Sequence, residues 1–193
     1  MTAERYPDAM NAVMTHLQRD SAEHSVRVAQ AAARLAEAYG SDVEDARIAG
    51  VLHDWCRDVG GAELLRRATD AGLPVTAVDT RTPYLLHGPL AAVELRVEFP
   101  WLSSQVLDAI AVHTYGSADI DTLGMILYVA DSIEPGRTHE GVQELREAVG
   151  EVPLSELFAR TYAASLRHLV AARRPIHPAT AETWNARVAG DRP

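Results

Sequence analysis

A chain of 193 residues has the length of a single domain, and 47% hydrophobic with 23% charged residues is the composition of a folded globular protein. Its 27 acidic residues outnumber its 18 basic ones, and the net charge of −9 argues against sequence-independent binding to nucleic acid. All 18 basic residues are arginines, so no lysine can form a Schiff base, and the single cysteine, Cys56, excludes an intrachain disulfide.

The start of the chain carries Glu4, Arg5 and Asp8 with no apolar segment after them, so we expect no signal peptide. The longest apolar stretch, residues 123–130, is far shorter than the ~20 residues that span a bilayer. Together with the single cysteine, these features predict a cytoplasmic protein without a membrane partner.

Helical periodicity of apolar residues runs through almost the whole chain. A capping box at Asp20 and Glu23 should open the first long helix, and Gly40 should end it; Ser41 should open the second. Residues 73–83 contain two prolines and are expected to form a loop. The predicted helices cover residues 20–39, 41–59, 62–71, 89–99, 104–113, 123–134, 140–149, 154–173 and a last stretch from 180. Because no segment alternates as a strand does, the predicted fold is all-α in one domain.

Six histidine and aspartate side chains lie on, or at the end of, otherwise apolar helix faces: His24, His53, Asp54, His87, His113 and Asp131. Taken singly, each could be a hydrogen-bonded core histidine or a capping aspartate. Burying several carboxylates is costly without compensation, however, and imidazole and carboxylate are good ligands for iron, manganese or zinc. The set, with Thr114 and Arg137 beside two of its members, therefore predicts a divalent metal site where several helices converge.

The order His24, His53-Asp54, Asp131 resembles the HD superfamily of metal-dependent phosphohydrolases, with His87 and His113 as the extra histidines of its multi-ligand branch. The resemblance narrows to the bacterial symmetrical bis(5′-nucleosyl)-tetraphosphatases (the YqeK family) and covers about residues 21–187. The segments that carry it are HSVRVAQAAARLAEAYG, AGVLHDWCRD, LLHGPLAA, AIAVHTYG, LYVADSIEPGR and RRPIHPATAETWN.

This resemblance implies one all-α HD domain over residues 1–193, with a core over about 21–134 and C-terminal helices over 140–187 that complete a nucleotide pocket. It implies one or two bound iron ions, with manganese, cobalt or zinc as alternatives. The implied reaction is symmetrical hydrolysis of diadenosine tetraphosphate, and of related dinucleoside tetraphosphates, to two ADP by a metal-activated hydroxide. The implied partners are nucleotides and not nucleic acid, and a homodimer stays open.

The resemblance also implies residue roles. The metal ligands would be His24, His53, Asp54 and Asp131, and His87 and His113 would either bind a second metal or contact the phosphates. The catalytic residues would be Asp54, His87, His113 and Arg137. The nucleotide-binding residues would be Ser21, Asp54, Trp55, Cys56, Arg57, His87, His113, Thr114, Asp131, Arg137, Arg174, Pro175, Ile176, His177, Pro178 and Ala179.

Some assignments keep an alternative. Ser21 stands where the family carries arginine, and Arg57 where it carries lysine, so the phosphate contacts can differ. Trp55 can instead pack in the core, Cys56 can be a small buried hydrophobe, and Arg27 is expected on a solvated face. The alternative functions are another HD nucleotide phosphohydrolase or phosphodiesterase, or a non-catalytic nucleotide sensor.

Overall fold

The computed structural model describes residues 5–189, and within them every regular element is a helix, which confirms the all-α prediction. The elements are α1 (Arg5–His16), α2 (Arg19–Tyr39), α3 (Val43–Leu52), α4 (Gly61–Asp70), α5 (Ala77–Arg81), the 3-10 helix η1 (Pro83–Leu86), α6 (His87–Glu98), α7 (Ser104–Val112), α8 (Thr122–Ile133), α9 (Val142–Glu147), α10 (Leu154–Ala171) and α11 (Pro178–Ala189). None of these helices is both long enough and apolar enough to cross a lipid bilayer.

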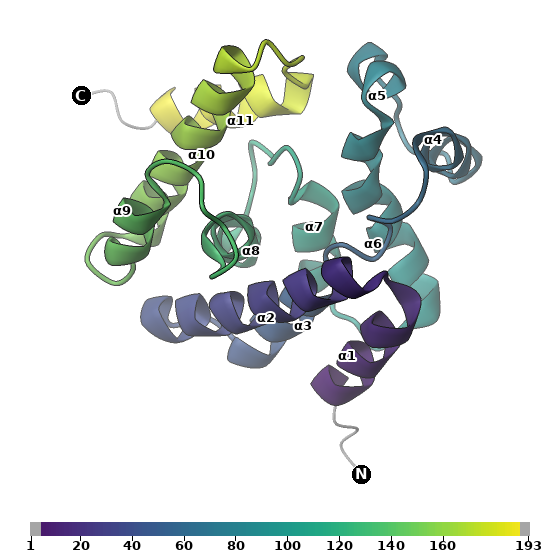
Figure 1. Cartoon of the computed structure of the whole chain (residues 1–193), viewed down its shortest axis with the longest axis horizontal. Coiled ribbons are helices and arrows are strands. Elements are labelled where there is room, and N and C mark those ends of the chain that lie inside the picture. Colours follow the sequence, from purple (N-terminus) through teal and green to yellow (C-terminus); the bar gives the residue numbers. More distant parts are fainter. Residues whose placement is uncertain (1–4, 190–193) are drawn as a thin grey trace.

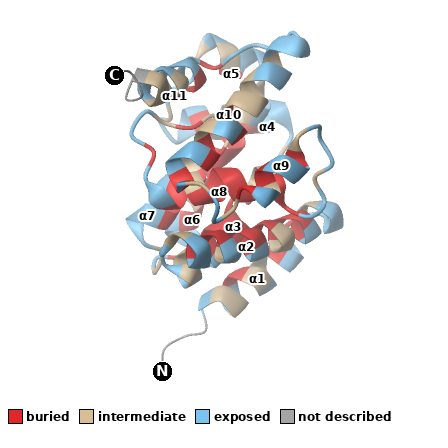
Figure 2. Ribbon diagram, turned by 90° about the vertical axis from the view of Figure 1, so that its left-hand side faces the viewer, coloured by how far each residue is buried: buried red, intermediate tan, exposed pale blue. Residues whose placement is uncertain are grey.

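Helix α8 lies at the centre of the molecule (Figure 1) and packs against α2, α3, α7, α9 and α10. Helices α2 and α3 run side by side along one edge. Helices α9, α10 and α11 lie on one side of α8, and α4, α5 and α6 lie on the other. Buried residues are frequent on α2, α3, α6 and α8, and Figure 2 shows them most clearly on α3 and α8, in the middle of the molecule.

Small residues bring α2 and α3 unusually close. A Cβ atom added at Gly50 of α3 would lie 2.6 Å from the Cα and 2.9 Å from the backbone nitrogen of Ala29 on α2. Only glycine therefore fits at this crossing. The contact also bears on the histidines, because the carbonyl oxygen of Gly50 accepts a hydrogen bond from His53 Nδ1 at 2.8 Å.

Replacing Gly50 with alanine is expected to force α2 and α3 apart. Overpacking of this kind lowers the free energy of unfolding by about 1–3 kcal/mol. In a domain of this size that corresponds to a fall of about 2–12 °C in Tm. The matched control is Gly61→Ala, whose added Cβ would come no closer than 3.4 Å to Pro83. Thermal unfolding of both variants checks this, and equal Tm values would contradict it.

The predicted start of the first long helix is wrong in its capping. Helix α2 begins at Arg19, and the residue before it, Gln18, makes no side-chain hydrogen bond to the helix end. Glu23 instead accepts a hydrogen bond from Arg19 Nε at 2.8 Å, so an i,i+4 pair replaces the expected capping box. The predicted end is confirmed, because Gly40 adopts the left-handed conformation with φ of 69°.

The second predicted helix is too long. Helix α3 is capped by Asp42 rather than Ser41, and it ends at Leu52 rather than near Gly60. Residues 53–58 form consecutive turns instead. This early end matters for the site, because His53 and Asp54 follow the helix and are not held to its regular spacing.

The expected loop over residues 73–83 is also wrong in part. It contains α5, whose capping box pairs Thr76 with Asp79, and it leads into η1. Helix α1 matches no predicted helix. Among the remaining boundaries, α6 begins at His87 rather than at Pro89, and α11 begins at Pro178 rather than at residue 180.

Candidate metal centre

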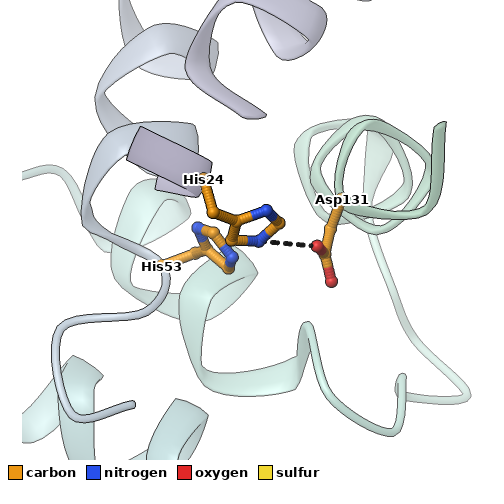
Figure 3. A group of neighbouring side chains, drawn as sticks. All are labelled: His24, His53 and Asp131. Carbon is orange, nitrogen blue, oxygen red and sulfur yellow. Dashed lines mark ion pairs between the residues drawn. The ribbon is translucent and has the colours of Figure 1, made fainter. Parts of the chain in front are cut away.

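The six predicted ligands come from five parts of the chain and meet beside α8. His24 comes from α2 and Asp131 from α8; Figure 3 shows both pointing toward His53, and His24 Nε2 lies 3.1 Å from Asp131 Oδ1. The His53-Asp54 pair follows α3, His87 is the first residue of α6, and His113 is the residue that ends α7.

Asp54 lies at the centre of this cluster and is almost completely buried. Its Oδ2 lies 3.2 Å from His53 Nε2 and 3.5 Å from His24 Nε2. Its Oδ1 lies 3.1 Å from His87 Nε2 and 3.7 Å from His113 Nε2. One carboxylate is therefore in reach of all four imidazoles.

Local backbone contacts fix how the four histidines present their rings. His53, His87 and His113 each place Nδ1 at 2.6–2.8 Å from the carbonyl oxygen three residues earlier in the chain. His24 Nδ1 lies 3.1 Å from Oε1 of Glu134. Carbonyl and carboxylate oxygens accept, so each Nδ1 donates, and in the neutral ring each Nε2 then carries a lone pair.

The clustered Nε2 atoms and carboxylate oxygens form a set of electron-pair donors that a bound cation would stabilise. Nε2 of His87 lies 2.9 Å from Nε2 of His113, so two lone pairs face each other unless a positive charge lies between them. Within residues 5–189, His53 Nε2 and Asp54 Oδ1 are buried without a hydrogen-bond partner. Two overlapping groups have ligand atoms within 4.8 Å of one another: His24, His53 and Asp131, and His53, Asp54 and His113. Imidazole nitrogens and carboxylate oxygens at such spacing suit a divalent transition metal.

The two carboxyl groups stay ionised because positive charge surrounds them. Burial raises the pKa of Asp54, but electrostatic attraction to His53 and hydrogen bonds from His113, His53 and His87 outweigh burial and hold this pKa well below its usual value. Burial likewise raises the pKa of Asp131, and His24, His53 and Arg137 lower it further than burial raises it. A metal ion would supply the same positive charge without protons on the imidazoles.

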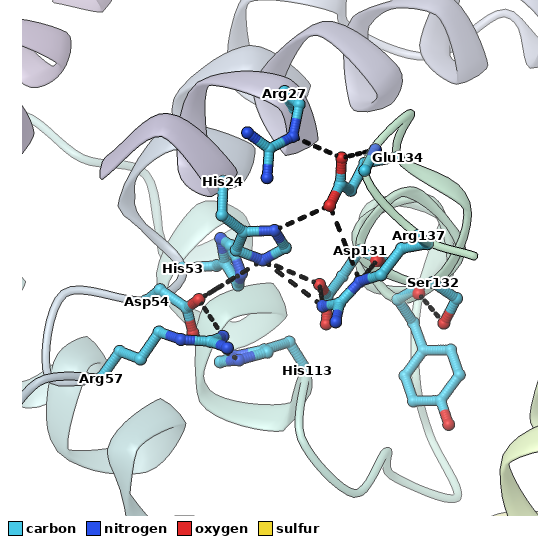
Figure 4. A network of polar contacts seen from close by, with 12 residues as sticks. His24, Arg27, His53, Asp54, Arg57, His113, Asp131, Ser132, Glu134 and Arg137 are labelled. Carbon is cyan, nitrogen blue, oxygen red and sulfur yellow. Dashed lines mark hydrogen bonds and ion pairs between the residues drawn. The ribbon is translucent and has the colours of Figure 1, made fainter. Parts of the chain in front are cut away.

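Two arginines flank the carboxylates (Figure 4). Arg57 Nη1 donates to Asp54 Oδ2 at 2.5 Å, and Arg137 donates through Nη2 to Asp131 Oδ1 and through Nε to the carbonyl oxygen of Asp131 at 2.9 Å. About one third of each arginine side chain is exposed. Both can therefore exchange these contacts for an anionic ligand.

The centre opens into a cavity of about 960 Å³ between η1, α8 and α10. Tyr84, Tyr115 and Arg167 line it together with seven of the predicted site residues. Those seven are Asp54, Arg57, His87, His113, Thr114, Asp131 and Arg137.

Three predicted nucleotide-binding residues near the His53-Asp54 pair lie outside this cavity lining. Ser21 donates through Oγ to Asp58 at 2.7 Å. Trp55 is buried against the ring of His16, with centroids 3.7 Å apart. Cys56 is buried and lies 3.4 Å from a carboxylate oxygen of Glu94, and burial raises the pKa of its thiol.

The predicted segment 174–179 lies beside the cavity rather than in its lining. Arg174, Pro175, Ile176 and Pro178 are exposed. His177 is buried, with its ring stacked on Tyr115 at 4.3 Å and its Nε2 3.4 Å from Asp79. Through Tyr115, which lines the cavity, the segment reaches the cavity edge.

Glu134 is a buried residue of the site that is not among the residues predicted from the sequence. It lies one turn after Asp131, as Arg27 lies one turn after His24, and its Oε2 accepts from Arg27 Nε at 2.7 Å. The solvated position expected for Arg27 is thus wrong in part. His24 and Arg27 on α2 are three residues apart, and so are Asp131 and Glu134 at the end of α8. This matching spacing is the sequence signal that could have revealed the contact between Arg27 and Glu134.

Comparison with known proteins agrees with the predicted family. The sequence model of the HD domain matches residues 21–136. A protein of Bacillus subtilis (strain 168), named symmetrical bis(5′-nucleosyl)-tetraphosphatase, is 31% identical over 183 residues, which cover 95% of this chain and 97% of that protein. A protein of the same name from Staphylococcus aureus (strain NCTC 8325 / PS 47) is 36% identical over 126 residues, covering 64% of this chain and 63% of that one.

A crystal structure extends the likeness to the fold. It is that of a predicted HD superfamily hydrolase involved in NAD metabolism from Clostridium acetobutylicum, with a TM-score of 0.89 and 32% identity, covering 96% of this chain and 97% of that one. The HD domain implies a divalent metal, and the His/Asp cluster supplies suitable ligands. From the domain match and the near full-length similarity, we conclude that the chain belongs to the HD-domain family and, within it, groups with the symmetrical bis(5′-nucleosyl)-tetraphosphatases.

Proposed function

We propose that this protein hydrolyses diadenosine tetraphosphate, and related dinucleoside tetraphosphates, symmetrically to two ADP. The observation that carries the proposal is the convergence of four imidazoles and two carboxylates beside a cavity of about 960 Å³, with two part-exposed arginines beside them. The names of the relatives support the substrate, since one of these proteins aligns with 95% of this chain.

We propose that His24, His53, Asp54 and Asp131 hold the metal, with His87 and His113 as ligands of a second ion or as phosphate contacts, and that the metal is iron. A divalent metal in such a site lowers the pKa of bound water toward neutrality and so supplies a nucleophile for phosphorus. The neutral Nε2 atoms described above are the ligand form that such binding requires.

The arginines would bind the phosphates. A tetraphosphate chain carries several negative charges that repel a nucleophile, and Arg57 and Arg137 can offset them through charge-assisted hydrogen bonds. In the reaction, a water oxygen bonds to one of the two inner phosphorus atoms, and the bond from that atom to the central bridging oxygen breaks. The attacking water loses a proton to the solvent, and the bridging oxygen leaves with the second ADP and takes up a proton, which His87 or His113 would donate if it is not a ligand and carries a proton on Nε2.

The C-terminal helices would complete the nucleotide pocket. Residues of α10, and Thr180 of α11, line the cavity that starts at the metal centre. The exposed residues of the segment 174–179 would contact a nucleoside at the cavity edge, where His177 of the same segment stacks on Tyr115. This supports one domain in which residues 140–187 act together with the core over 21–134.

Product analysis tests the proposed function. Diadenosine tetraphosphate should give ADP alone, because the metal centre and the flanking arginines would hold the middle of the phosphate chain. In oxygen-18 water, each cleavage should place one label on the β-phosphoryl group of one of the two ADP molecules. ATP, offered in parallel, should be hydrolysed poorly. Early appearance of ATP and AMP, or label in AMP, would contradict symmetrical cleavage.

A further inference from the structure

The histidines of the metal centre are not all held alike. His53, His87 and His113 donate through Nδ1 to neutral backbone carbonyls of their own local turns. His24 donates to Oε1 of Glu134, a carboxylate 110 residues away in the chain, at 3.1 Å. Among the four histidines of this cluster, all within the described residues, His24 is thus the one whose Nδ1 donates to a carboxylate.

Glu134 is itself fixed from several sides. Its side chain is 2% exposed, and its Oε2 accepts from Arg27 Nε at 2.7 Å and from the backbone nitrogen of Gly136 at 2.5 Å. The guanidinium of Arg27, the backbone amide of Gly136 and the ring of His24 all contact its two oxygens, and such a set of donors favours a carboxylate that accepts hydrogen bonds. Arg137 Nε lies 3.8 Å from the oxygen that faces His24.

Gly136 makes this arrangement sterically possible. A Cβ at this position would lie 2.9 Å from both Arg27 Nε and Glu134 Oε1, closer than side chains tolerate. The turn after α8 therefore folds back with its bare backbone against the Arg27–Glu134 pair. The carboxylate cannot swing away from His24 without breaking contacts with α2 and with this turn.

We propose that Glu134 is a positioning residue of the metal centre: held by Arg27 and Gly136, it keeps the Nδ1 proton on His24 and directs the Nε2 lone pair toward the metal. A carboxylate behind a ligating imidazole fixes the ring orientation and makes the opposite nitrogen a stronger ligand. The negative charge of Glu134 should therefore raise metal affinity beyond what a neutral acceptor at the same place provides. The inference rests on the metal site of the proposed function but not on its substrate.

Metal affinity, measured without substrate, tests this role. We expect the apoprotein of Glu134→Gln, which keeps the size of the side chain, to bind Co²⁺ about 10–100-fold more weakly than wild type in equilibrium dialysis. The visible absorption bands of bound Co²⁺ should change as well, since the ligand field at His24 changes. Arg27→Ala, which frees Glu134 without removing it, should weaken Co²⁺ binding in the same direction by at least ~3-fold.

The matched control is Glu147→Gln on the exposed face of α9, which should bind Co²⁺ as wild type does. If Glu134→Gln does not fold, the Co²⁺ affinity of Arg27→Ala decides whether Glu134 supports metal binding. Affinities within about twofold of wild type for the folded variants, even with a lower Tm, would reduce Glu134 to a structural ion pair and overturn the proposal. Wild type that binds no Co²⁺ would overturn it too, and would show that the metal site fails independently of any hydrolysis assay.

Discussion

Replacing Asp54 with alanine is expected to reduce the hydrolysis of diadenosine tetraphosphate to the background rate. The Asp54 carboxylate lies within 3.7 Å of Nε2 of all four clustered histidines, so its removal takes away the group that joins them. It also leaves Arg57 without its 2.5 Å partner. Loss of a metal ligand should cost far more than loss of one hydrogen bond, because the nucleophile itself depends on the metal.

Two further variants distinguish a loss of catalysis from a loss of folding. Asp54→Asn keeps the shape of the side chain but not its charge, and we expect it to be as inactive as the alanine variant while retaining the wild-type helical circular dichroism. Asp108→Ala removes an exposed aspartate of α7 and should leave turnover unchanged. An active Asp54→Asn enzyme would remove Asp54 from the ligand set.

Replacing Arg137 with alanine is expected to slow the hydrolysis of diadenosine tetraphosphate, but less severely than replacing Asp54 with alanine does. Arg137 is bound to Asp131 and is one third exposed to the cavity, so it can reach a phosphate oxygen without being a metal ligand. Loss of one such charged donor costs about 2–4 kcal/mol of transition-state stabilisation, a factor of ~30–1000 in kcat/KM. Steady-state kinetics with diadenosine tetraphosphate measures this loss.

Two companion variants sharpen the result. Arg137→Lys keeps the charge but loses the planar fork, and we expect its kcat/KM between those of wild type and Arg137→Ala. Arg34→Ala, on the exposed face of α2, is the control and should match wild type. An Arg137→Ala variant as inactive as Asp54→Ala would contradict the assigned roles, because Arg137 would then be indispensable to the metal centre.

Periodicity found most of the helices, but it missed α1 and α5 and did not give all of the helix ends. It extended the second helix to near Gly60, whereas α3 ends at Leu52, because apolar spacing does not report where hydrogen bonding switches to turns. Residues 73–83 were expected to be a loop on account of their prolines, although Thr76 and Asp79 form the capping box that opens α5. Such a segment contains both residues that break helices and residues that cap them. Packing against the rest of the protein decides which of the two prevails, and the sequence of the segment alone does not show that packing.

The ligand cluster itself was predictable, and its supporting contacts were not. Histidine and aspartate on apolar faces gave the six residues that the structure brings together. Glu134 was not predicted as a site residue because its partners His24 and Arg27 are more than 100 residues away in the chain. The family resemblance implied that Trp55 and Cys56 contact the nucleotide, with packing in the core as the alternative, and in the structure both side chains lie in the hydrophobic core.

The metal content of the purified protein tests the central claim most directly. Elemental analysis of wild type should find about one or two equivalents of a transition metal per chain, with iron the largest share, and Asp54→Ala should retain much less. Less than about half an equivalent of every metal in wild type, with Asp54→Ala no different, would contradict a metal centre at this cluster.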